Sequence, residues 1–180
     1  MRHMNNNHNT GSKVKDLEEL AALLGQEQTK GKKVILCHGV FDLLHIGHIR
    51  YLERAKKLGD ILVVTLTQDR YVNKGPHRPA FTESLRAEVL AALDCVDYVA
   101  VNKWPTAVET IKLLRPDIYA KGAEYKDNRT DEILSEAAAV ESVGSQIEFI
   151  EDITSSSSHL INRHLEIFPE ETRDYLKDFS

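Results

Sequence analysis

Long apolar runs and an excess of basic residues are both absent from this chain of 180 residues. No stretch approaches the roughly 18 consecutive apolar residues that a membrane-spanning helix needs, so we expect no membrane partner. The first twelve residues contain no apolar segment of the kind that a secretory signal requires. The net charge of -5 argues against a nucleic-acid partner, because nucleic-acid binders usually carry a basic surface.

Cysteine is also scarce, and the two in the chain are Cys37 and Cys95. Each lies in or beside an apolar run, which favours buried, reduced thiols over a disulfide and indicates a cytoplasmic protein. Apolar residues make up 42% of the chain and charged residues 28%, a balance typical of a folded globular protein. The length suits one domain with a substantial core.

Short apolar runs alternate with segments of helical periodicity along most of the chain. The expected strands are 33–37, 61–66, 98–101, 117–120 and 146–150. The expected helices include one from Val14 that ends at Gly25, one that ends at Gly59, one that opens at Thr82, and the segments 105–114 and 131–142. This alternation predicts an α/β fold, a Rossmann-like doubly wound parallel sheet of about five strands with helices on both faces. We expect a flexible tail over residues 1–12, the folded domain over 13–168 and a helical extension over 169–180.

In a parallel sheet of this kind, ligands bind at the carboxyl ends of the strands. The loop after the first strand begins with Gly39, where a side chain would obstruct a phosphate that approaches the backbone. His45 and His48 follow at the start of a helix, and Gly47 leaves space between them. A helix N-terminus attracts anions through its free N–H groups and its dipole, and imidazoles can donate hydrogen bonds to phosphoryl oxygens. The segment therefore predicts a phosphate-binding site.

Two alternatives exist for a histidine pair with this spacing. The imidazoles could be zinc ligands, or they could be ordinary surface side chains. Asp42 is the only acidic residue beside them and no cysteine adjoins them, which disfavours a zinc site. We therefore predict no protein-bound metal.

The stretch GVFDLLHIGHIRYLERAKKLGDILVV resembles the opening βαβ unit of the cytidylyltransferase-like nucleotidyltransferases of the HIGH superfamily, and the resemblance extends over about residues 32–162. It implies transfer of a nucleotidyl group from ATP or CTP to a phosphate ester, with release of pyrophosphate and no covalent enzyme intermediate. His45, His48, Lys74 and Arg86 are the catalytic residues that it implies, the last two as phosphate ligands. The nucleotide-binding residues that it implies are Gly39, Val40, Phe41, Asp42, Gly47, Lys121, Gly122, Ser155, Ser156, Ser157 and Ser158.

Two segments separate the branches of this family. Lys121-Gly122, followed by Glu124 and Tyr125, is similar to the heptose 1-phosphate adenylyltransferase domain of ADP-heptose synthases. The Arg-Thr-Glu-Gly pattern of the cytidylyltransferases is absent, since residues 151–154 read Glu-Asp-Ile-Thr. Both features favour a sugar phosphate, of heptose 1-phosphate type, as the acceptor. A CTP-dependent enzyme acting on glycerol 3-phosphate or another polyol phosphate is the alternative, and a non-catalytic nucleotide-binding module is another.

The resemblance also implies Mg²⁺ bound with the nucleoside triphosphate. Relatives are commonly homodimers, which leaves a homodimer open for this chain. Some are fused to a ribokinase-like sugar kinase domain, which would make residues 169–180 the start of a linker. Trp104 follows the third expected strand, where it either stacks on a base or covers the edge of the sheet. The sequence leaves open which of the two holds.

Overall fold

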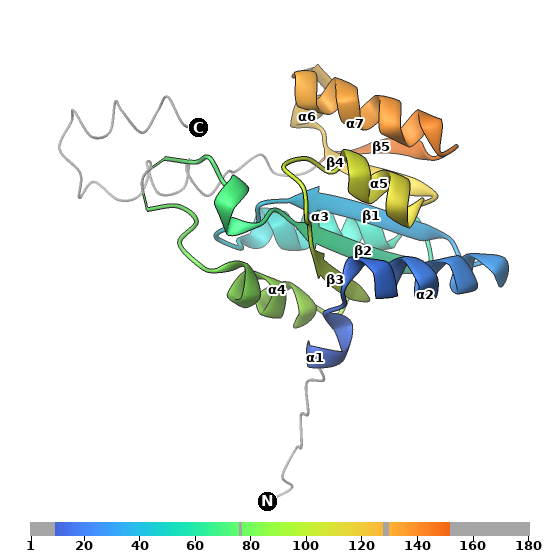
Figure 1. Ribbon diagram of the computed structural model, residues 1–180, viewed down its shortest axis with the longest axis horizontal. Coiled ribbons are helices and arrows are strands. Elements are labelled where there is room, and N and C mark those ends of the chain that lie inside the picture. The colour runs from blue at the N-terminus through green and yellow to red at the C-terminus, as the bar shows by residue number, and fades with distance from the viewer. Residues whose placement is uncertain (1–9, 76, 128–129, 152–180) are drawn as a thin grey trace, which may run out of the picture.

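The computed structural model describes residues 10–75, 77–127 and 130–151, and it contains a parallel sheet of five strands (Figure 1). The strands are β1 (Val34–Gly39), β2 (Ile61–Leu66), β3 (Tyr98–Val101), β4 (Ile118–Gly122) and β5 (Gln146–Ile150). Their order across the sheet is β3-β2-β1-β4-β5, and every neighbouring pair is parallel. The predicted fold class is therefore confirmed.

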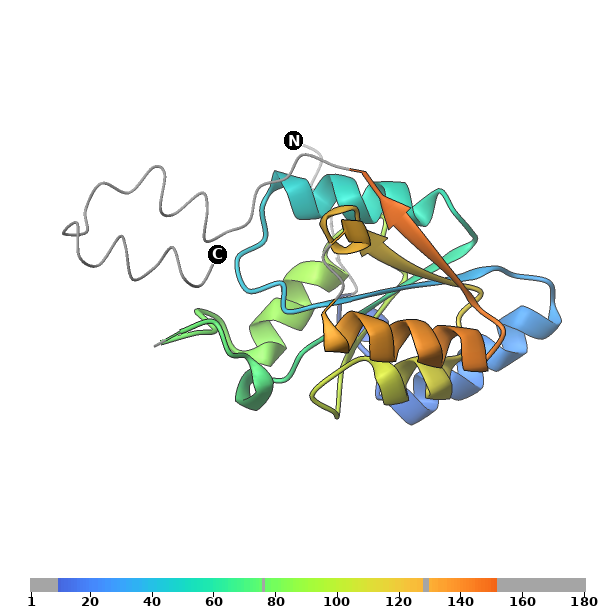
Figure 2. The ribbon, with the colours of Figure 1, turned by 90° about the horizontal axis from the view of Figure 1, so that it is seen from above.

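Helices cover both faces of this sheet. They are α1 (Thr10–Lys13), α2 (Leu17–Thr29), α3 (Ile46–Lys56), α4 (Glu83–Ala91), α5 (Val108–Leu114), α6 (Glu124–Asp127) and α7 (Asp131–Ser142), with a 3₁₀ turn, η1, over Asp69–Tyr71. The helices α3 and α4 pack on one face, and α2, α5 and α7 pack on the other. Figure 2 shows α3 on the opposite side of the sheet from α2, α5 and α7.

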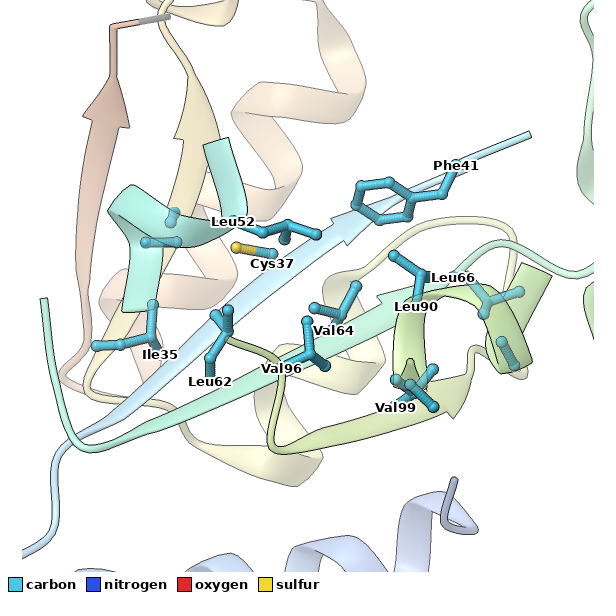
Figure 3. Close-up of a cluster of buried hydrophobic side chains, with 14 of the residues drawn as sticks. Ile35, Cys37, Phe41, Leu52, Leu62, Val64, Leu66, Leu90, Val96 and Val99 are labelled. Carbon is cyan, nitrogen blue, oxygen red and sulfur yellow. The ribbon is translucent and has the colours of Figure 1, made fainter. Parts of the chain in front are cut away.

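Two apolar clusters, one on each face, hold these layers together. On the α3/α4 face, Leu52 of α3 and Leu90 of α4 belong to one cluster with apolar side chains of β1 and β2, among them Cys37 and Leu66 (Figure 3). The second cluster joins α2, α5 and α7 to the opposite face. All six residues of β2 are buried, because a central strand of a parallel sheet has no solvent face. This explains why the strand appears in the sequence as an uninterrupted apolar run.

Several details of the predicted elements were wrong, among them the start of the first long helix, which is Leu17 rather than Val14. The helix α2 runs through Gly25 to Thr29, because helix-favouring residues follow the glycine and Gly31, at φ 81°, supplies the left-handed turn instead. The helix α5 begins at Val108 rather than at Pro105. The short helices α1 and α6 were not predicted, and α1 includes residues 10–12 of the expected tail.

Gly59, expected as a helix end, lies three residues beyond the last residue of α3. A Cβ atom there would lie 2.8 Å from the Lys33 carbonyl oxygen and 2.7 Å from Ile35 Cδ1. Close approach of the chain to β1 therefore requires glycine at this position. Within the described part of the chain, no helix has the length and apolar character that crossing a bilayer requires.

Candidate active site

The order of the strands reverses between β1 and β4, which are neighbours in the sheet with Cys37 opposite Ala120. In such sheets the crevice outside the carboxyl ends at this point is where ligands bind. The loop after β1, the N-terminus of α3 and the end of β4 all lie at this edge. The Tyr51 hydroxyl of α3 donates a hydrogen bond to the Ala120 carbonyl at 2.6 Å, which ties α3 to β4. Most of the predicted site residues in the described part of the chain therefore lie at the carboxyl-end edge of the sheet.

His45 and His48 form the N-terminal cap of α3. His45 Nδ1 accepts a hydrogen bond from the Gly47 backbone N–H at 3.2 Å, and His48 Nδ1 accepts one from the His45 N–H at 3.4 Å. The two rings lie with their centroids 3.9 Å apart. Each imidazole therefore satisfies backbone donors that a helix start leaves free.

The cap also fixes the tautomer of both rings. A neutral imidazole whose Nδ1 accepts a hydrogen bond carries its proton on Nε2. His45 Nε2 is buried and has no hydrogen-bond partner among the described residues. The helix start therefore presents an N–H donor that needs an acceptor.

Both imidazoles are held in the neutral form. Burial, then the neighbouring His45 and then Lys74, together lower the pKa of His48 to about 4. Burial also lowers the pKa of His45, and the charge of Lys74 adds to this effect. Both rings can therefore donate a hydrogen bond from Nε2 without carrying a charge at neutral pH.

Phe41 shapes the loop between β1 and α3. Its backbone is left-handed, with φ 49°, and its ring packs edge-on against His48 with centroids 5.4 Å apart. A Cβ atom at Gly39 would lie 3.2 Å from that ring, so the absence of a side chain at Gly39 makes room for Phe41. In the structure, this glycine serves the packing that supports His48.

Asp42 anchors a second loop, the one between β2 and α4. Its side chain is 1% exposed, and Oδ2 accepts a hydrogen bond from Arg78 Nε. Oδ1 accepts from the backbone N–H groups of Ala80, at 2.6 Å, and of Phe81, at 3.4 Å. The sequence indicated Asp42 but not its partner Arg78, which has no motif around it.

Lys74 lies in this same loop. Its side chain is exposed, yet the surrounding protein displaces enough water to lower the pKa of the Lys74 ammonium. The charge of the Arg78 guanidinium lowers this pKa as well, and the charge of Asp42 raises it. Its charge also acts on both histidines. The structure therefore brings Lys74 into electrostatic reach of the histidine pair.

Arg86, on α4, is 2% exposed and directed at protein atoms. Its Nε donates to the Phe81 carbonyl at 3.1 Å, Nη2 to the Thr67 carbonyl at 2.8 Å and to Asp69 Oδ1 at 2.7 Å, and Nη1 to the Val40 carbonyl. These acceptors belong to the segments after β1 and β2. In this structure the guanidinium joins the segments that surround the crevice.

Lys121, at the end of β4, forms an ion pair with Glu136 of α7 at 2.8 Å. Its ammonium also lies 4.9 Å from the centroid of the Tyr125 ring and 5.4 Å from that of Tyr119. Burial and the Glu136 carboxylate raise the pKa of Tyr119 far above its ordinary value. Lys121 is therefore held on the α7 side, by a partner that the sequence did not indicate.

Ser155 to Ser158, Trp104 and the absence of a metal site are the predictions that remain. Ser155, Ser156, Ser157 and Ser158 lie outside the described residues. Trp104 is half-buried and packs against the apolar cluster under α2 and α5, and its base-stacking role stays untested. Among the described residues no three His, Cys, Asp or Glu side chains gather as metal ligands.

A cavity of about 500 Å³ opens at the amino ends of β1, β4 and β5 and is lined by Lys33, Asp117 and Gln146 among others. It therefore lies at the opposite edge of the sheet from the histidine pair.

The sequence of this chain is also similar to that of a known protein family. Residues 36–164 match the protein family described as Cytidylyltransferase-like. The chain belongs to this family.

Curated relatives of this cytidylyltransferase-like chain include the bifunctional protein HldE of Syntrophotalea carbinolica, which is 42% identical over 158 residues. That alignment covers 86% of this chain and 31% of the relative. The HldE protein of Campylobacter jejuni subsp. doylei is 49% identical over 117 residues, which are 64% of this chain and 25% of that protein. The chain thus spans a quarter to a third of the length of these relatives.

Solved structures support the same placement. The lipopolysaccharide core biosynthesis protein from Thermoplasma volcanium GSS1 is 29% identical, with a TM-score of 0.57, and the match covers 70% of this chain and 100% of that one. Pantoate-beta-alanine ligase from Francisella tularensis shares 13% identity at a TM-score of 0.55, over 92% of this chain and 85% of that one. The second likeness is one of fold alone.

One buried titratable group of this cytidylyltransferase-like domain lies beside the crevice with no predicted role. His38 is buried, its Nδ1 lies 3.0 Å from the Thr65 hydroxyl, and its Nε2 lies 3.4 Å from the Thr67 hydroxyl. Burial lowers the pKa of His38 from 6.5 to about 3, and the charge of Lys121 contributes to the shift. Folding therefore requires a neutral imidazole at this position.

We predict that this requirement weakens the fold in mild acid. Because the pKa of His38 is lower in the folded state, the unfolded chain binds one more proton below about pH 6.5, and the free energy of unfolding falls as the pH falls. Replacing His38 with Asn should reduce that slope by about 1.4 kcal/mol per pH unit in urea unfolding between about pH 5.5 and 4, where the unfolded imidazole is protonated and the folded one is still neutral. His77→Asn, at an exposed position, is the control. An unchanged slope in His38→Asn would mean that other groups cause the acid sensitivity.

Proposed function

We propose that the chain is an adenylyltransferase that transfers AMP from ATP to a heptose 1-phosphate and releases pyrophosphate. The observation that carries this proposal is the histidine cap of α3, where Nδ1 atoms bind the backbone and the His45 Nε2 donor is buried without a partner. A phosphoryl group is the acceptor that such a helix start favours.

The reaction needs no group on the protein to form a bond. An oxygen of the sugar phosphate attacks the α-phosphorus of ATP in line, a new phosphorus–oxygen bond forms, and the bond to the bridging oxygen of the β-phosphate breaks. His45 and His48 donate hydrogen bonds to the α-phosphoryl oxygens, whose negative charge grows in the transition state. Neutral rings suit this role, because they stabilise charge without transferring a proton.

The other predicted residues receive supporting roles. Lys74 contributes positive charge on the side of the β2–α4 loop. Gly39 to Asp42 shape the nucleotide loop, and Lys121 and Gly122 border the crevice from β4, with Lys121 oriented by Glu136. Ser155 to Ser158 remain proposed phosphate ligands. Arg86 holds the surrounding segments through their carbonyl groups, so we assign it a positioning role.

Adenylyl transfer to a sugar phosphate is favoured over the cytidylyl alternative by the relatives. The HldE proteins are 42% and 49% identical, and a structural relative is named for lipopolysaccharide core biosynthesis. Lys121-Gly122 with the following Tyr125 supports the same branch. A non-catalytic binding module would have no need for paired donors at the α-phosphoryl position.

A divalent ion, Mg²⁺, is part of this proposal. It would neutralise charge on the triphosphate and the departing pyrophosphate. Because the described residues provide no cluster of three ligands, we infer that the ion is held chiefly by phosphate oxygens.

The length of the relatives supports a further proposal about architecture. Because the chain corresponds to 31% of the Syntrophotalea protein, we propose that it functions beside a second domain, a sugar kinase. A kinase could supply the phosphorylated sugar that this domain consumes.

Pyrophosphate release measured with each nucleotide and each acceptor tests the function. We expect turnover with ATP and heptose 1-phosphate, and little with CTP or with glycerol 3-phosphate. ATP should also raise the melting temperature, since a ligand at about 100 times its Kd stabilises the native state by about 2.7 kcal/mol. Binding of ATP without turnover of any acceptor would support the non-catalytic module, and a preference for CTP would support the cytidylyltransferase.

A further inference from the structure

Arg78 is a second cation of the β2–α4 loop, and one nitrogen of its guanidinium is held by the protein while another has no partner among the described residues. Its side chain is 17% exposed, and Nε is held by the buried carboxylate of Asp42. The other carboxylate oxygen of Asp42 binds the backbone of Ala80 and Phe81, so the loop and the guanidinium are anchored together. The orientation of Arg78 is therefore set by the protein before any ligand arrives.

One nitrogen of the same guanidinium lacks an acceptor within the described part of the chain. Arg78 Nη2 is buried and has no hydrogen-bond partner among the described residues. A buried donor without an acceptor is unfavourable, and planar guanidinium groups bind phosphoryl oxygens well through parallel N–H groups. The free donor is explained if a ligand supplies an oxygen at this place.

The surroundings of Arg78 are those of the active site. Its charge acts on Lys74, and the charge of Lys74 acts on His45 and His48. Two cations and two neutral donors thus lie within electrostatic reach of one another. A site for a single triphosphate already has the helix start, so the additional cations can serve a second anionic substrate.

The topology indicates which substrate that is. In the proposed function the nucleotide lies at the carboxyl ends of β1 and β4, whereas Arg78 comes from the loop after β2, on the other side of β1. In-line transfer requires the acceptor phosphate to approach the α-phosphorus opposite the departing pyrophosphate. The β2–α4 loop lies on the side of β1 away from β4, and we infer that the acceptor enters from that side.

We propose that Arg78, oriented by Asp42, binds the phosphoryl oxygens of the acceptor sugar phosphate. This inference rests on the proposed adenylyltransferase function and adds to it a specific acceptor ligand. A simple structural ion pair is the competing explanation, and it would satisfy Asp42 but leave Nη2 without a role.

Steady-state kinetics of Arg78→Gln and Arg78→Lys in the 180-residue chain test the proposal. The KM for heptose 1-phosphate should rise by about 10-fold to 100-fold in Arg78→Gln, the usual effect of losing a hydrogen bond to a charged group, while the KM for ATP changes by less than about threefold. Arg78→Lys should show a substantial loss as well, because an ammonium cannot bind Asp42 and the phosphate as a planar fork. Arg70→Gln is the matched control, since Arg70 is exposed and binds Gln68.

A second variant separates binding from folding. Arg78→Gln leaves the buried Asp42 without its cation, so the double variant Asp42→Asn with Arg78→Gln removes both charges and preserves an acceptor for Ala80. A stable double variant should keep the rise in acceptor KM. Equal increases in both KM values, or no change in either, would overturn the acceptor role.

The outcome remains informative if the proposed function is wrong. Should the wild-type chain turn over no sugar phosphate, the adenylyltransferase proposal fails on its own. Inorganic phosphate is then the probe, and it should raise the melting temperature of the wild-type chain but not that of Arg78→Gln. No rise in the wild type, or an equal rise in both, would refute a phosphate site at Arg78.

Discussion

Replacing His48 with alanine is expected to lower kcat by at least about 100-fold, the usual cost of removing one donor that stabilises charge in a transition state. The expectation follows from the position of the ring, whose Nδ1 is occupied by the His45 N–H and whose Nε2–H is the remaining donor. Pyrophosphate release with saturating ATP and heptose 1-phosphate measures it. The KM for ATP should change less than kcat, because the interaction grows in the transition state.

The alanine variant also removes a helix cap, which by itself costs about 1 kcal/mol of stability. His48→Asn separates the two effects, because its side-chain oxygen can replace Nδ1 as the acceptor of the His45 N–H while no donor remains at Nε2. We expect this variant to melt close to the wild type and to lose as much turnover as the alanine variant. Recovery of kcat in His48→Asn would show that the cap matters and that the donor does not.

The fold was predictable because its signals are local. A strand buried on both faces appears in the sequence as a continuous apolar run, which is why the bounds of β2 and β3 were predicted correctly. Where an element's end depends on competing local preferences, the prediction failed. Gly25 was taken as the end of α2, yet the helix continues to Thr29, because one glycine costs only about 1 kcal/mol in a helix.

The candidate site was predictable where a motif carries it and unpredictable where tertiary contacts do. His45, Gly47 and His48 lie together because they share one helix start. Arg78 is a different case, because its guanidinium is held by Asp42, 36 residues earlier in the chain. No local sequence pattern connects these two residues. The position of Arg78 four residues after Lys74, in the same loop, is the single sequence signal by which it could have been found.

Glu136 shows the same limit. It lies on α7, 15 residues after Lys121, and a charged residue on a helix normally indicates an exposed face. In the structure it is 1% exposed and paired with Lys121. Charged residues inside an otherwise apolar helix face are therefore the positions at which such partners could be sought.

Replacing Arg86 with alanine is expected to lower the free energy of unfolding by about 3–5 kcal/mol, the cost of removing one partner of a buried charged network. The guanidinium binds three carbonyl groups and the Asp69 carboxylate, and all four would lose their donor. Urea unfolding measures the loss. Arg86→Lys should be destabilised as well, because one ammonium cannot reach acceptors on three segments.

This variant also decides between the two roles of Arg86, as a phosphate ligand and as a positioning residue. If Arg86 were a phosphate ligand, its replacement would raise the KM for ATP and leave the stability of the protein nearly normal. If Arg86 is a positioning residue, its replacement would lower the melting temperature. It would also lower kcat and raise both KM values together, because Val40 and Thr67, which it binds, follow the carboxyl ends of β1 and β2. The buried guanidinium, with protein acceptors at Nε, Nη1 and Nη2, predicts the second pattern. A stable Arg86→Lys variant with a selective loss of ATP affinity would instead restore Arg86 to the phosphate ligands.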